Sequence, residues 1–429
     1  MQGQALPGFR DFYPEDLAFR NSIFATWREV ARRYGFQEYD GPPLEPLELY
    51  TAKSGAEIVQ QLYAFEDKGG RKVALRPEMT PTLARMVGAR AQALKKPIRW
   101  FSIPQLFRYE RQQRGRLREH FQLNMDIIGE AGPAADAELI AAAIDIMRAF
   151  GLGAEDVRLR LSDRRVLTSL LRKHPQFQGE RVQIAFEVLD KIERQGRSET
   201  ERRLREAQFD ASAIERLFEI ASLKGLEAVQ EELRSCPDGP AAGESLVAVT
   251  AGLGAMGLSD FIEIDLTVVR GLAYYTGVVF ELFDRGKELR AICGGGRYDS
   301  LIQEVAGIDL PCVGFGMGDV VLGELLRERH QRFEAPGQLD AFLVAVGGED
   351  VAPVLRLAAQ LRERGVAAEY ALRNQPIRKQ LELAAARGAP RAVIIGPDER
   401  KAKVAVVWDL KTGKQRKVSL TKVRKGVFK

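Results

Sequence analysis

Polar and apolar residues alternate from residue 118 to residue 129, in the sequence REHFQLNMDIIG. Because successive side chains of a strand point to opposite faces, this spacing predicts a β-strand with one polar face and one apolar face. Solvent alone explains many such faces, since antiparallel sheets often have one side in water. A row of amide, carboxylate and cationic groups can also bind a ligand. The members of this polar row are Arg118, His120, Gln122, Asn124 and Asp126.

The strand expected before the polar row adds a cation and a carboxylate. FSIPQLFRYE (101–110) is followed by a charged, glycine-containing tip, RQQRGR (111–116), which predicts a hairpin. Cross-strand neighbours share a face, so Arg108 and Glu110 are expected to join the polar row. An arginine on a rigid strand can bind a phosphate through two hydrogen bonds, while amide and carboxylate oxygens accept from an ammonium group or a ring N–H. The cluster suits a zwitterionic substrate beside a nucleotide.

Two further segments carry groups that such a site needs. The sequence ALRPEMT places Glu78 and Thr80, two hydrogen-bond acceptors, just before an expected helix, where helix capping is the competing interpretation. The sequence VVRGLAYYTG places Arg270 close to Tyr274 and Tyr275, and core aromatics beside a surface arginine would give the same pattern. The fold decides between these interpretations.

Helices and strands alternate around these segments. Residues 15–35 have helical spacing, and FQEYDGPPLEP (36–46) is then expected to be extended because its proline pair breaks a helix. A helix is expected at 80–93, and strands return at 261–284. AICGGGRYD then supplies three glycines, 294–296, which either allow a ligand to approach the backbone or form a bulge or tight turn.

Residues 165–256 differ from the strand-rich segments around them. They are charged and rich in Leu and Ala, with apolar residues at helical spacing. This predicts an inserted, largely helical module that ends in the loop CPDGPAAG (236–243). A glycine-rich run then leads into a helix in PCVGFGMGDVVLGELLRER (311–329). We expect a first domain over residues 1–330 that includes the module.

A second domain is expected at residues 338–429, after a polar Pro/Gly linker at 331–337. Strand and helix patterns alternate over about 90 residues, which is typical of a compact α/β domain. Its tail, residues 400–425, contains ten Lys and Arg residues and the single acidic residue Asp409. Such a basic run is compatible with a solvated face and with nucleic-acid contact.

The composition of the 429 residues, 45% hydrophobic and 29% charged, is that of a globular protein with two or three domains. Three widely spaced cysteines and three scattered histidines predict neither a disulfide framework nor a protein-held transition metal. The N-terminus lacks a signal-peptide pattern, and no stretch reaches the roughly 20 apolar residues of a membrane span. We therefore expect a cytoplasmic protein without membrane contact. The net charge of +5 permits a polyanionic partner.

Five segments occur in an order that resembles the histidyl-tRNA synthetase family of class II aminoacyl-tRNA synthetases. They are YGFQEYDGPP, LRPEMT, FRYERQQRGRLR with its return strand, VVRGLAYYTGVVFE and GGGRYD. The resemblance covers almost the whole chain, and the last two segments are its specific part because other class II enzymes lack them. It implies an α+β fold with a class II antiparallel sheet flanked by helices, a helical insertion and a C-terminal α/β anticodon-binding domain.

The resemblance also implies a reaction and its partners. A ligase of this family attaches histidine to tRNA(His) through a histidyl-adenylate, uses ATP with Mg²⁺, and releases AMP and pyrophosphate. The histidine carboxylate attacks the α-phosphorus, and two arginines offset the charge on the phosphate oxygens. A homodimer is also implied, because Pro42 resembles the proline of the class II motif at the dimer interface.

Matching positions carry the family's residue roles into this sequence. Arg108 and Arg270 resemble the catalytic arginines, with Arg108 on the ATP α-phosphate and Arg270 between that phosphate and the substrate carboxylate. ATP would also contact Glu110 near adenine, Arg116 in the hairpin tip, and His120 at the position of an adenine-stacking aromatic. The implied histidine-binding residues are Glu78, Thr80, Gln122, Asp126, Tyr274 and Tyr275.

Some positions depart from the family pattern. Val321 stands where the third class II motif ends in an arginine that holds the γ-phosphate. A valine cannot bind phosphate, and the candidates to replace that contact are Arg114 or Arg116 of the tip, or Mg²⁺. Ala273 replaces an aspartate and Gln112 replaces a proline. The imidazole of the adenine-stacking position also offers less area than a larger aromatic ring.

Two other functions explain parts of the sequence. A non-catalytic, histidine-sensing regulatory paralogue on the same scaffold would explain Val321, but it needs neither Arg108 and Arg270 nor a basic C-terminal domain. A nucleic-acid-binding module without catalysis would explain the basic tail but not the histidine-like pocket. Gln113 matches a family position implicated in reading the extra 5′ nucleotide of the tRNA, and is the candidate tRNA-binding residue.

Overall fold

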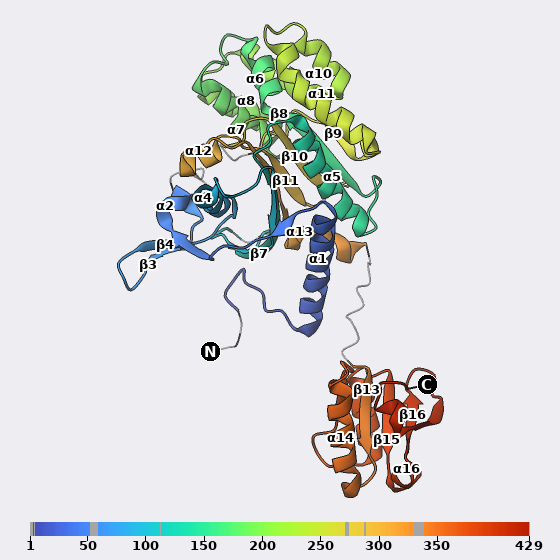
Figure 1. Cartoon of the computed structure of the whole chain (residues 1–429). Coiled ribbons are helices and arrows are strands. Elements are labelled where there is room, and N and C mark those ends of the chain that lie inside the picture. The colour runs from blue at the N-terminus through green and yellow to red at the C-terminus, as the bar shows by residue number, and fades with distance from the viewer. Residues whose placement is uncertain are drawn as a thin grey trace. The chain divides into compact units, whose positions relative to one another are not determined.

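The chain folds into two compact units, Met1–Gln331 and Arg332–Lys429, in a computed structural model (Figure 1). The expected linker at 331–337 lies outside the described residues, as do Gln112 and Ala273. The structure describes residues 3, 5–51, 59–111, 113–270, 274–286, 289–329 and 339–428.

A nine-stranded sheet forms the centre of the N-terminal unit. Its strands, in spatial order, are β1 (Gln37–Glu38), β5 (Ile98–Ser102), β7 (Glu119–Ile128), β12 (Cys312–Gly318), β11 (Cys293–Arg297), β10 (Val278–Asp284), β8 (Val157–Asp163) and β9 (Ile262–Ile264). The ninth strand, β6 (Gln105–Phe107), pairs with β7. All pairs from β5 to β8 are antiparallel, whereas the two edge pairs, β1 with β5 and β8 with β9, are parallel.

The expected hairpin is present, but the expected continuous strand over 101–110 is wrong. Both β5 and β6 pair with β7, and they are separated at Ile103 and Pro104. Proline has no N–H to donate to a sheet, which interrupts the ladder. The Pro104 carbonyl still accepts a hydrogen bond from the Gln122 N–H at 3.1 Å, so the register continues past the break.

The apolar face of β7 is covered by helices. The helices on this face are α1 (Pro14–Arg33), α5 (Pro133–Ala149) and α13 (Asp319–Glu328). Leu123 and Met125 are fully buried there, and the Phe121 ring packs on Phe24 of α1 with 5.2 Å between ring centroids. The expected division of this strand into a polar and an apolar face is therefore confirmed.

Two further helices pack on one another and cover part of the opposite, polar face. They are α4 (Thr80–Arg90) and α12 (Leu301–Ala306). They bury Leu83, Val87 and Leu301 against Ile98 and Ile128 of the sheet. The polar residues of β7 precede Ile128 in the strand, so they lie beside this cover.

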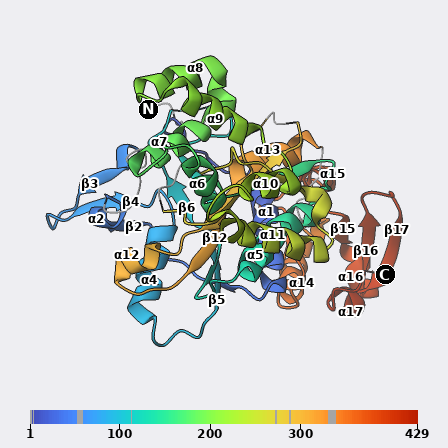
Figure 2. The same ribbon diagram turned by 90° about the horizontal axis from the view of Figure 1, so that it is seen from above.

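The segment expected to be helical does form helices, which gather at the top of the N-terminal unit in Figure 1. They are α6 (Arg164–Arg172), α7 (Glu180–Leu189), α8 (Ile192–Glu206), α9 (Ala211–Ser222), α10 (Leu226–Leu233) and α11 (Gly239–Ala255). The expected loop at 236–243 is wrong in its second half, because α11 begins at Gly239. Pro240 falls in the first helical turn, where its missing N–H has no partner to lose. In Figure 2, α11 lies beside α5.

A small sheet follows the first extended segment. Its order is β2 (Leu44–Pro46), β4 (Lys72–Leu75), β3 (Ala64–Glu66), and α2 (Leu47–Thr51) directly follows β2. Two of its large apolar side chains are exposed: Leu44 at 38% and Phe65 at 51%. None of the described helices has the length and apolar character needed to cross a bilayer.

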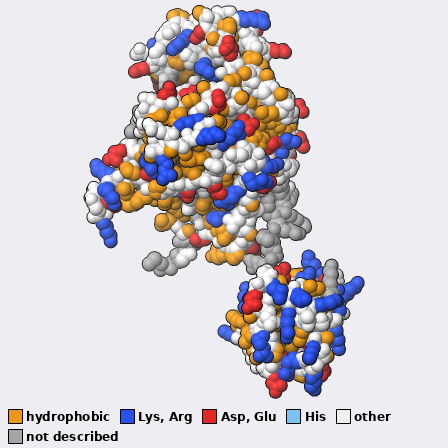
Figure 3. Space-filling view, viewed as in Figure 1, with side chains coloured by type: hydrophobic (Ala, Val, Ile, Leu, Met, Phe, Trp, Pro, Cys, Tyr) orange, Lys and Arg blue, Asp and Glu red, His pale blue; other side chains and the backbone are white. Residues whose placement is uncertain are grey.

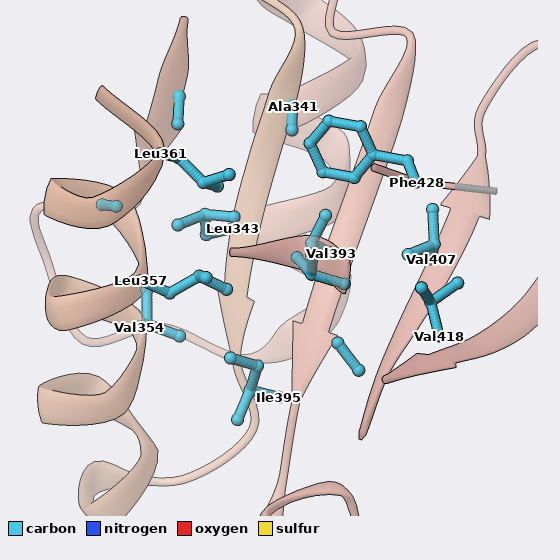
Figure 4. Packing of buried hydrophobic residues seen from close by; sticks show 14 residues of the cluster. Ala341, Leu343, Val354, Leu357, Leu361, Val393, Ile395, Val407, Val418 and Phe428 are labelled. Atoms are coloured by element: carbon cyan, nitrogen blue, oxygen red, sulfur yellow. The ribbon is translucent and has the colours of Figure 1, made fainter. Parts of the chain in front are cut away.

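The C-terminal unit is an α/β fold, as expected. Its sheet has the order β14 (Ala368–Tyr370), β13 (Ala341–Ala345), β15 (Arg391–Ile395), β16 (Val404–Asp409), β17 (Gln415–Ser419). Its helices are α14 (Val351–Arg362), α15 (Ile377–Ala386), α16 (Pro397–Ala402) and α17 (Leu420–Val423). In Figure 4, Leu357 and Leu361 of α14 pack on Leu343 and Val393 of the sheet. The unit therefore has a hydrophobic core of its own.

The basic tail of the C-terminal unit contains an edge strand that the sequence did not reveal. β17 pairs with β16 on one side, and four of its five residues are exposed. The carboxylate of Asp409 accepts hydrogen bonds from the Lys411 and Thr412 N–H groups in the turn between the strands, and its single charge offsets only a small part of the tail's positive charge. Lys and Arg side chains are prominent on the face of this unit shown in Figure 3.

Candidate functional site

The register of the sheet brings polar side chains of β7 next to glycines of two neighbouring strands. Asn124 pairs with Gly316 of β12, Gly316 pairs with Gly294 of β11, and Gly294 pairs with Glu281 of β10. Directly paired residues share one face of a sheet. The polar face of β7 thus continues across Gly314, Gly316 and Gly294, which we call the glycine surface, to the carboxylate of Glu281.

The glycines are necessary because site side chains occupy the space where a Cβ would stand. A Cβ on Gly314 would lie 2.0 Å from Asp126 Oδ1, and one on Gly316 would lie 2.7 Å from Gln122 Cδ. The competing interpretation of 294–296 as a bulge or tight turn is wrong, because these residues lie inside β11 and pair with strands on both sides. The glycine-rich run before α13 is the strand β12.

Asp126 is buried, with 4% of its surface exposed, and accepts a hydrogen bond from the Tyr298 hydroxyl. Burial disfavours the charged carboxylate and raises the pKa of Asp126 to about 7, although the hydrogen bond from Tyr298 opposes this shift. Tyr298 was not among the expected site residues, although it belongs to the GGGRYD segment. Its position opposite Asp126 depends on the pairing of distant strands.

Arg270 lies over the glycine surface. A Cβ on Gly294 would lie 2.2 Å from Arg270 Nη1, and the guanidinium forms an ion pair with Glu281. Burial lowers the pKa of Arg270, but Glu281 and Tyr275 outweigh this and raise it overall, so the guanidinium stays charged. The backbone of Arg270 has φ +61°, which non-glycine residues rarely adopt. Such strain persists only where neighbouring groups hold the backbone.

Arg164, the first residue of α6, supplies that restraint. Its guanidinium donates hydrogen bonds to the carbonyl oxygens of Val269 at 3.2 Å, Arg270 at 3.1 Å and Tyr275 at 2.8 Å. These contacts hold the chain on both sides of residues 271–273, which lie outside the described residues. Neither Arg164 nor Glu281 was expected at the site, because each acts through a contact between distant segments.

Glu78 and Thr80 contact the tyrosine segment rather than capping α4. The N-cap of α4 is Met79, and no side chain caps the helix. The Tyr274 hydroxyl donates a hydrogen bond to Glu78 Oε2 at 3.1 Å and also interacts with the Thr80 side chain. Tyr275 lies beside Tyr274, with 5.2 Å between ring centroids. The capping interpretation of this pair is therefore wrong.

The hairpin places a second charged group next to Glu78. Arg108 Nε donates to the Pro77 carbonyl at 2.9 Å, and Arg108 Nη1 lies 4.0 Å from Glu110 Oε1. Arg116 Nη1 lies 2.7 Å from the other oxygen of Glu110. The guanidinium of Arg108 is partly exposed, at 26% of its side chain, so it remains open to a ligand.

Arg118 and His120, the first two residues of the polar row, do not lie against the glycine surface as Gln122 and Asp126 do. Arg118 precedes β7, donates to the Glu110 carbonyl at 3.2 Å, and stacks on Tyr109. Burial, followed by the charges of Arg108 and Arg10, lowers the pKa of His120 to about 3, so its ring is neutral at pH 7. A neutral ring is suited to stacking rather than to ion pairing.

The arginine of the GGGRYD segment has a structural role. Arg297 is 3% exposed, and its Nη2 lies 2.5 Å from Asp136 Oδ2 of α5. It also donates to Asp299 and to the Glu130 carbonyl. This arginine therefore anchors β11 to α5, away from the glycine surface.

The structure thus brings the expected site residues together in two adjoining groups. The first group, on the glycine surface, consists of Gln122, Asp126, Arg270, Tyr274, Tyr275, Glu78 and Thr80. The second, in the hairpin, consists of Arg108, Glu110, Arg116, Gln113 and His120. Pro77 joins them, because it precedes Glu78 and accepts from Arg108. Among the described residues, no three or more His, Cys, Asp or Glu side chains are placed to hold a metal ion.

Comparisons with known proteins agree with this geometry. The family described as histidyl-tRNA synthetase matches residues 8–318, and the family described as anticodon binding domain matches residues 340–429. A histidine–tRNA ligase of Opitutus terrae is 47% identical over 421 residues, which are 95% of this chain and 94% of the relative. The chloroplastic/mitochondrial histidine–tRNA ligase of Arabidopsis thaliana is 40% identical, over 96% of this chain and 84% of the relative.

A solved structure has the same fold. The crystal structure of histidyl-tRNA synthetase from Nostoc sp. PCC 7120 superposes with a TM-score of 0.82 at 24% sequence identity, and covers 99% of each chain. The expected α+β class, with a helix-flanked, largely antiparallel sheet and a C-terminal anticodon-binding domain, is confirmed.

The raised pKa of Asp126 predicts a pH-dependent cost of the buried carboxylate. The pKa of Asp126 is about 7 in the folded protein, and its ordinary value is 3.8. The folded protein therefore holds the Asp126 proton more tightly than the unfolded chain does. Its stability is highest below pH 3.8, and the part that depends on Asp126 is lost as the pH rises through 7. Asp126→Asn removes this titration. As the pH rises from about 4 to about 7, we expect the variant to gain stability relative to wild type, on the order of a few kcal/mol.

Urea unfolding followed by tryptophan fluorescence measures this difference. In a Trp408→Phe background, the remaining Trp27 and Trp100 report on the N-terminal unit alone. Asp67→Asn is the control, because Asp67 is only half-buried and hydrogen bonds from the backbone of Arg71 lower its pKa, so its pH dependence has the opposite sign. A gap between Asp126→Asn and wild type that stays constant with pH would contradict the assignment.

Proposed function

Because the chain belongs to the histidyl-tRNA synthetase family, we propose that it activates histidine with ATP and transfers it to tRNA(His). The observation that carries this proposal is the joining of two groups on one sheet face. The glycine surface with Asp126 and Arg270 fits an amino acid with a polar ring, and the adjoining hairpin arginines fit phosphates. One surface can therefore hold both substrates next to each other.

We propose that the first group binds histidine. Glu78, Thr80 and Gln122 accept hydrogen bonds from the α-ammonium group, and Asp126 accepts from an imidazole N–H. Tyr298 donates to Asp126 Oδ1, which leaves Oδ2 for the ring N–H. A buried carboxylate oxygen without a donor costs about 1–3 kcal/mol or more, so a substrate without a ring donor is disfavoured. Tyr298 orients Asp126 toward the ring. The other ring contacts come from Tyr274 and Tyr275, which lie beside the glycine surface.

We propose that the second group binds ATP. Arg108 contacts the α-phosphate, Glu110 lies near adenine, and Arg116 contacts the phosphates. His120 is neutral at pH 7 and stacks on the base. Mg²⁺ enters with the nucleotide as part of the Mg·ATP substrate and offsets charge on its phosphates.

The first step then needs no side-chain nucleophile. A histidine carboxylate oxygen bonds to the α-phosphorus while the bond to the β-phosphate oxygen breaks, and that electron pair leaves with pyrophosphate. Arg270 and Arg108 stabilise the charge that collects on the α-phosphate oxygens. Glu281 and the carbonyl contacts of Arg164 hold Arg270 in place before the reaction, so little reorganisation is required.

In the second step a ribose hydroxyl of the terminal adenosine of the tRNA attacks the mixed anhydride, and AMP leaves. We propose that the C-terminal unit binds the anticodon, which its family match and its exposed basic edge strand β17 support. Arg400 is not available for this contact, because its Nε lies 2.5 Å from Asp350 Oδ1. Gln113, at the hairpin tip, is the proposed contact for the extra 5′ nucleotide of the tRNA.

A regulatory histidine sensor on the same scaffold is the alternative. A sensor requires the histidine-binding group but no charged residues for phosphates. The chain retains Arg108 and Arg270 in fixed positions, and its relatives with 40–47% identity bear ligase names. These observations favour the enzyme.

Histidine-dependent exchange of labelled pyrophosphate into ATP tests the activity. We expect exchange with the purified protein and a roughly 100- to 1000-fold loss of kcat in Arg270→Ala, because one preorganised charge at the reacting phosphate is removed. Arg71→Ala is the control, since Arg71 is exposed and its ion pair is with nearby Asp67. Histidine binding without any exchange would favour the sensor, and a fully active Arg270→Ala would exclude that residue from the site.

Removing residues 338–429 separates the two proposed steps. We expect the truncated protein to retain pyrophosphate exchange and lose most tRNA charging, because the deleted unit has its own core and the site lies in the other unit. Both rates are measured on the same preparation, with circular dichroism to check folding. An equal loss of both rates would mean that the unit supports folding of the site.

We also propose that the protein is a cytoplasmic homodimer. Pro42 precedes β2, and the small sheet that contains β2 exposes Leu44 and Phe65, two large apolar side chains suited to an interface. Sedimentation equilibrium should give twice the chain mass of 47.8 kDa, and Phe65→Glu should lower that mass. A wild-type protein that sediments as a monomer at micromolar concentration would contradict the dimer.

A further inference from the structure

Val321 replaces the arginine that the family pattern places near the γ-phosphate of ATP, and the structure shows a cavity beside Val321. The cavity has a volume of about 210 Å³. Its walls come from the hairpin tip, from the connection between β10 and β11, and from α13. The lining residues are Arg114, Gly115, Leu289, Arg290, Val321 and Glu324. Two arginines therefore line the cavity that an arginine at position 321 would otherwise reach.

Arg114 is already neutralised. Its Nε lies 3.4 Å from Glu324 Oε2, and its Nη2 forms an ion pair with Glu328. Both carboxylates belong to α13. A phosphate would have to compete with two fixed negative charges, so Arg114 is unsuited to binding it.

Arg116 also has a carboxylate partner. Its Nη1 lies 2.7 Å from Glu110 Oε2, and Glu110 is 8% exposed. This pairing holds Arg116 near the adenine and α-phosphate end of the hairpin. Arg116 is therefore committed to the group that already contains Arg108.

Arg290 differs from both, because it has no carboxylate partner within the described part of the chain. Its guanidinium donates a hydrogen bond to the neutral side-chain oxygen of Gln113. Burial lowers the pKa of Arg290, and the charges of Arg116 and Arg194 lower it further, with Glu110 as the opposing influence. The guanidinium of Arg290 is thus partly buried and lies near other arginines, and a bound anion would stabilise its charge.

The geometry places Arg290 opposite Val321 across a glycine. A Cβ built on Gly115 would lie 3.2 Å from Val321 Cγ2 and 3.9 Å from Arg290 Cδ. Glycine and valine are small, so the guanidinium of Arg290 has room on the side where a longer side chain from α13 would stand. The two positions are 31 residues apart in sequence but face the same hairpin tip.

We propose that Arg290 binds the terminal phosphates of ATP and the departing pyrophosphate, in place of the arginine missing from position 321. This rests on the proposed function. When the bond between the α-phosphorus and its bridging oxygen breaks, the electron pair moves to the pyrophosphate, and Arg290 stabilises the charge that gathers there. The family pattern has this cation on helix α13, whereas here it comes from the connection before β11. The positive charge near the phosphates is the same in both cases.

Steady-state pyrophosphate exchange with Arg290→Ala tests the proposal. We expect the KM for ATP and the KM for pyrophosphate to rise about 10- to 100-fold, the loss typical of one charged hydrogen-bonding group, with the KM for histidine unchanged. Arg290→Lys should recover part of the loss. Arg285→Ala, in the same connection, removes an equal charge and should leave all three constants unchanged, since Arg285 donates to the Ala154 carbonyl away from the cavity.

A second variant separates phosphate binding from a structural role. Arg290→Ala combined with Val321→Arg restores an arginine on the opposite wall, and should recover at least tenfold in the KM for pyrophosphate. An unchanged KM in Arg290→Ala, or a larger rise in Arg114→Ala, would overturn the proposal. So would a double variant no better than Arg290→Ala alone.

Direct binding keeps this test independent of catalysis. Calorimetric titration of full-length wild type and Arg290→Ala with pyrophosphate measures the contact without turnover. If wild type shows no exchange but binds pyrophosphate more tightly than the variant, the proposed enzyme activity fails while the role of Arg290 stands. Equal binding by the two proteins would overturn that role.

Discussion

The candidate site depends on the absence of side chains from one face of two neighbouring strands. Gly294, Gly314 and Gly316 lie where Arg270, Asp126 and Gln122 need room, and a single methyl group at any of them would overlap the functional side chain. Sheet glycines usually weaken a strand, because they pack nothing and lose more entropy on folding. Here the strands are central and paired on both sides, so the ladder supplies the stability that the missing side chains do not.

Electrostatics in this setting follow from what is buried beside the glycines. Asp126 is deprived of water and held by a hydroxyl, so it binds a proton more tightly than an exposed aspartate. Arg270 is also buried but has Glu281 beside it, so it remains a fixed cation. Asp126 is thus suited to a hydrogen-bond donor, and Arg270 is suited to an anion. This combination matches an amino acid substrate with a polar ring and a phosphate next to it.

The departures from the family pattern make sense when charges are followed in space rather than along the chain. Val321 removes a cation from α13, yet Arg290 reaches the same cavity from another element and lacks a carboxylate partner in the described structure. Arg114, which looked equally suitable in the sequence, is held by two glutamates. The position that supplies a charge can change if the charge itself stays near the phosphates.

The sequence alone determined most of the elements and the two faces of β7, because alternation and helical spacing are local properties of the chain. It also indicated the family and most of the candidate residues. Only the tertiary structure decided that Glu78 and Thr80 contact Tyr274 instead of capping α4, and that residues 294–296 form a strand paired on both sides. Tyr298, Glu281, Arg164 and Arg290 became visible as partners only there. Each depends on strand register or on contact between segments far apart in sequence. A shift of one residue in the register of β10 would turn Glu281 to the other face of the sheet.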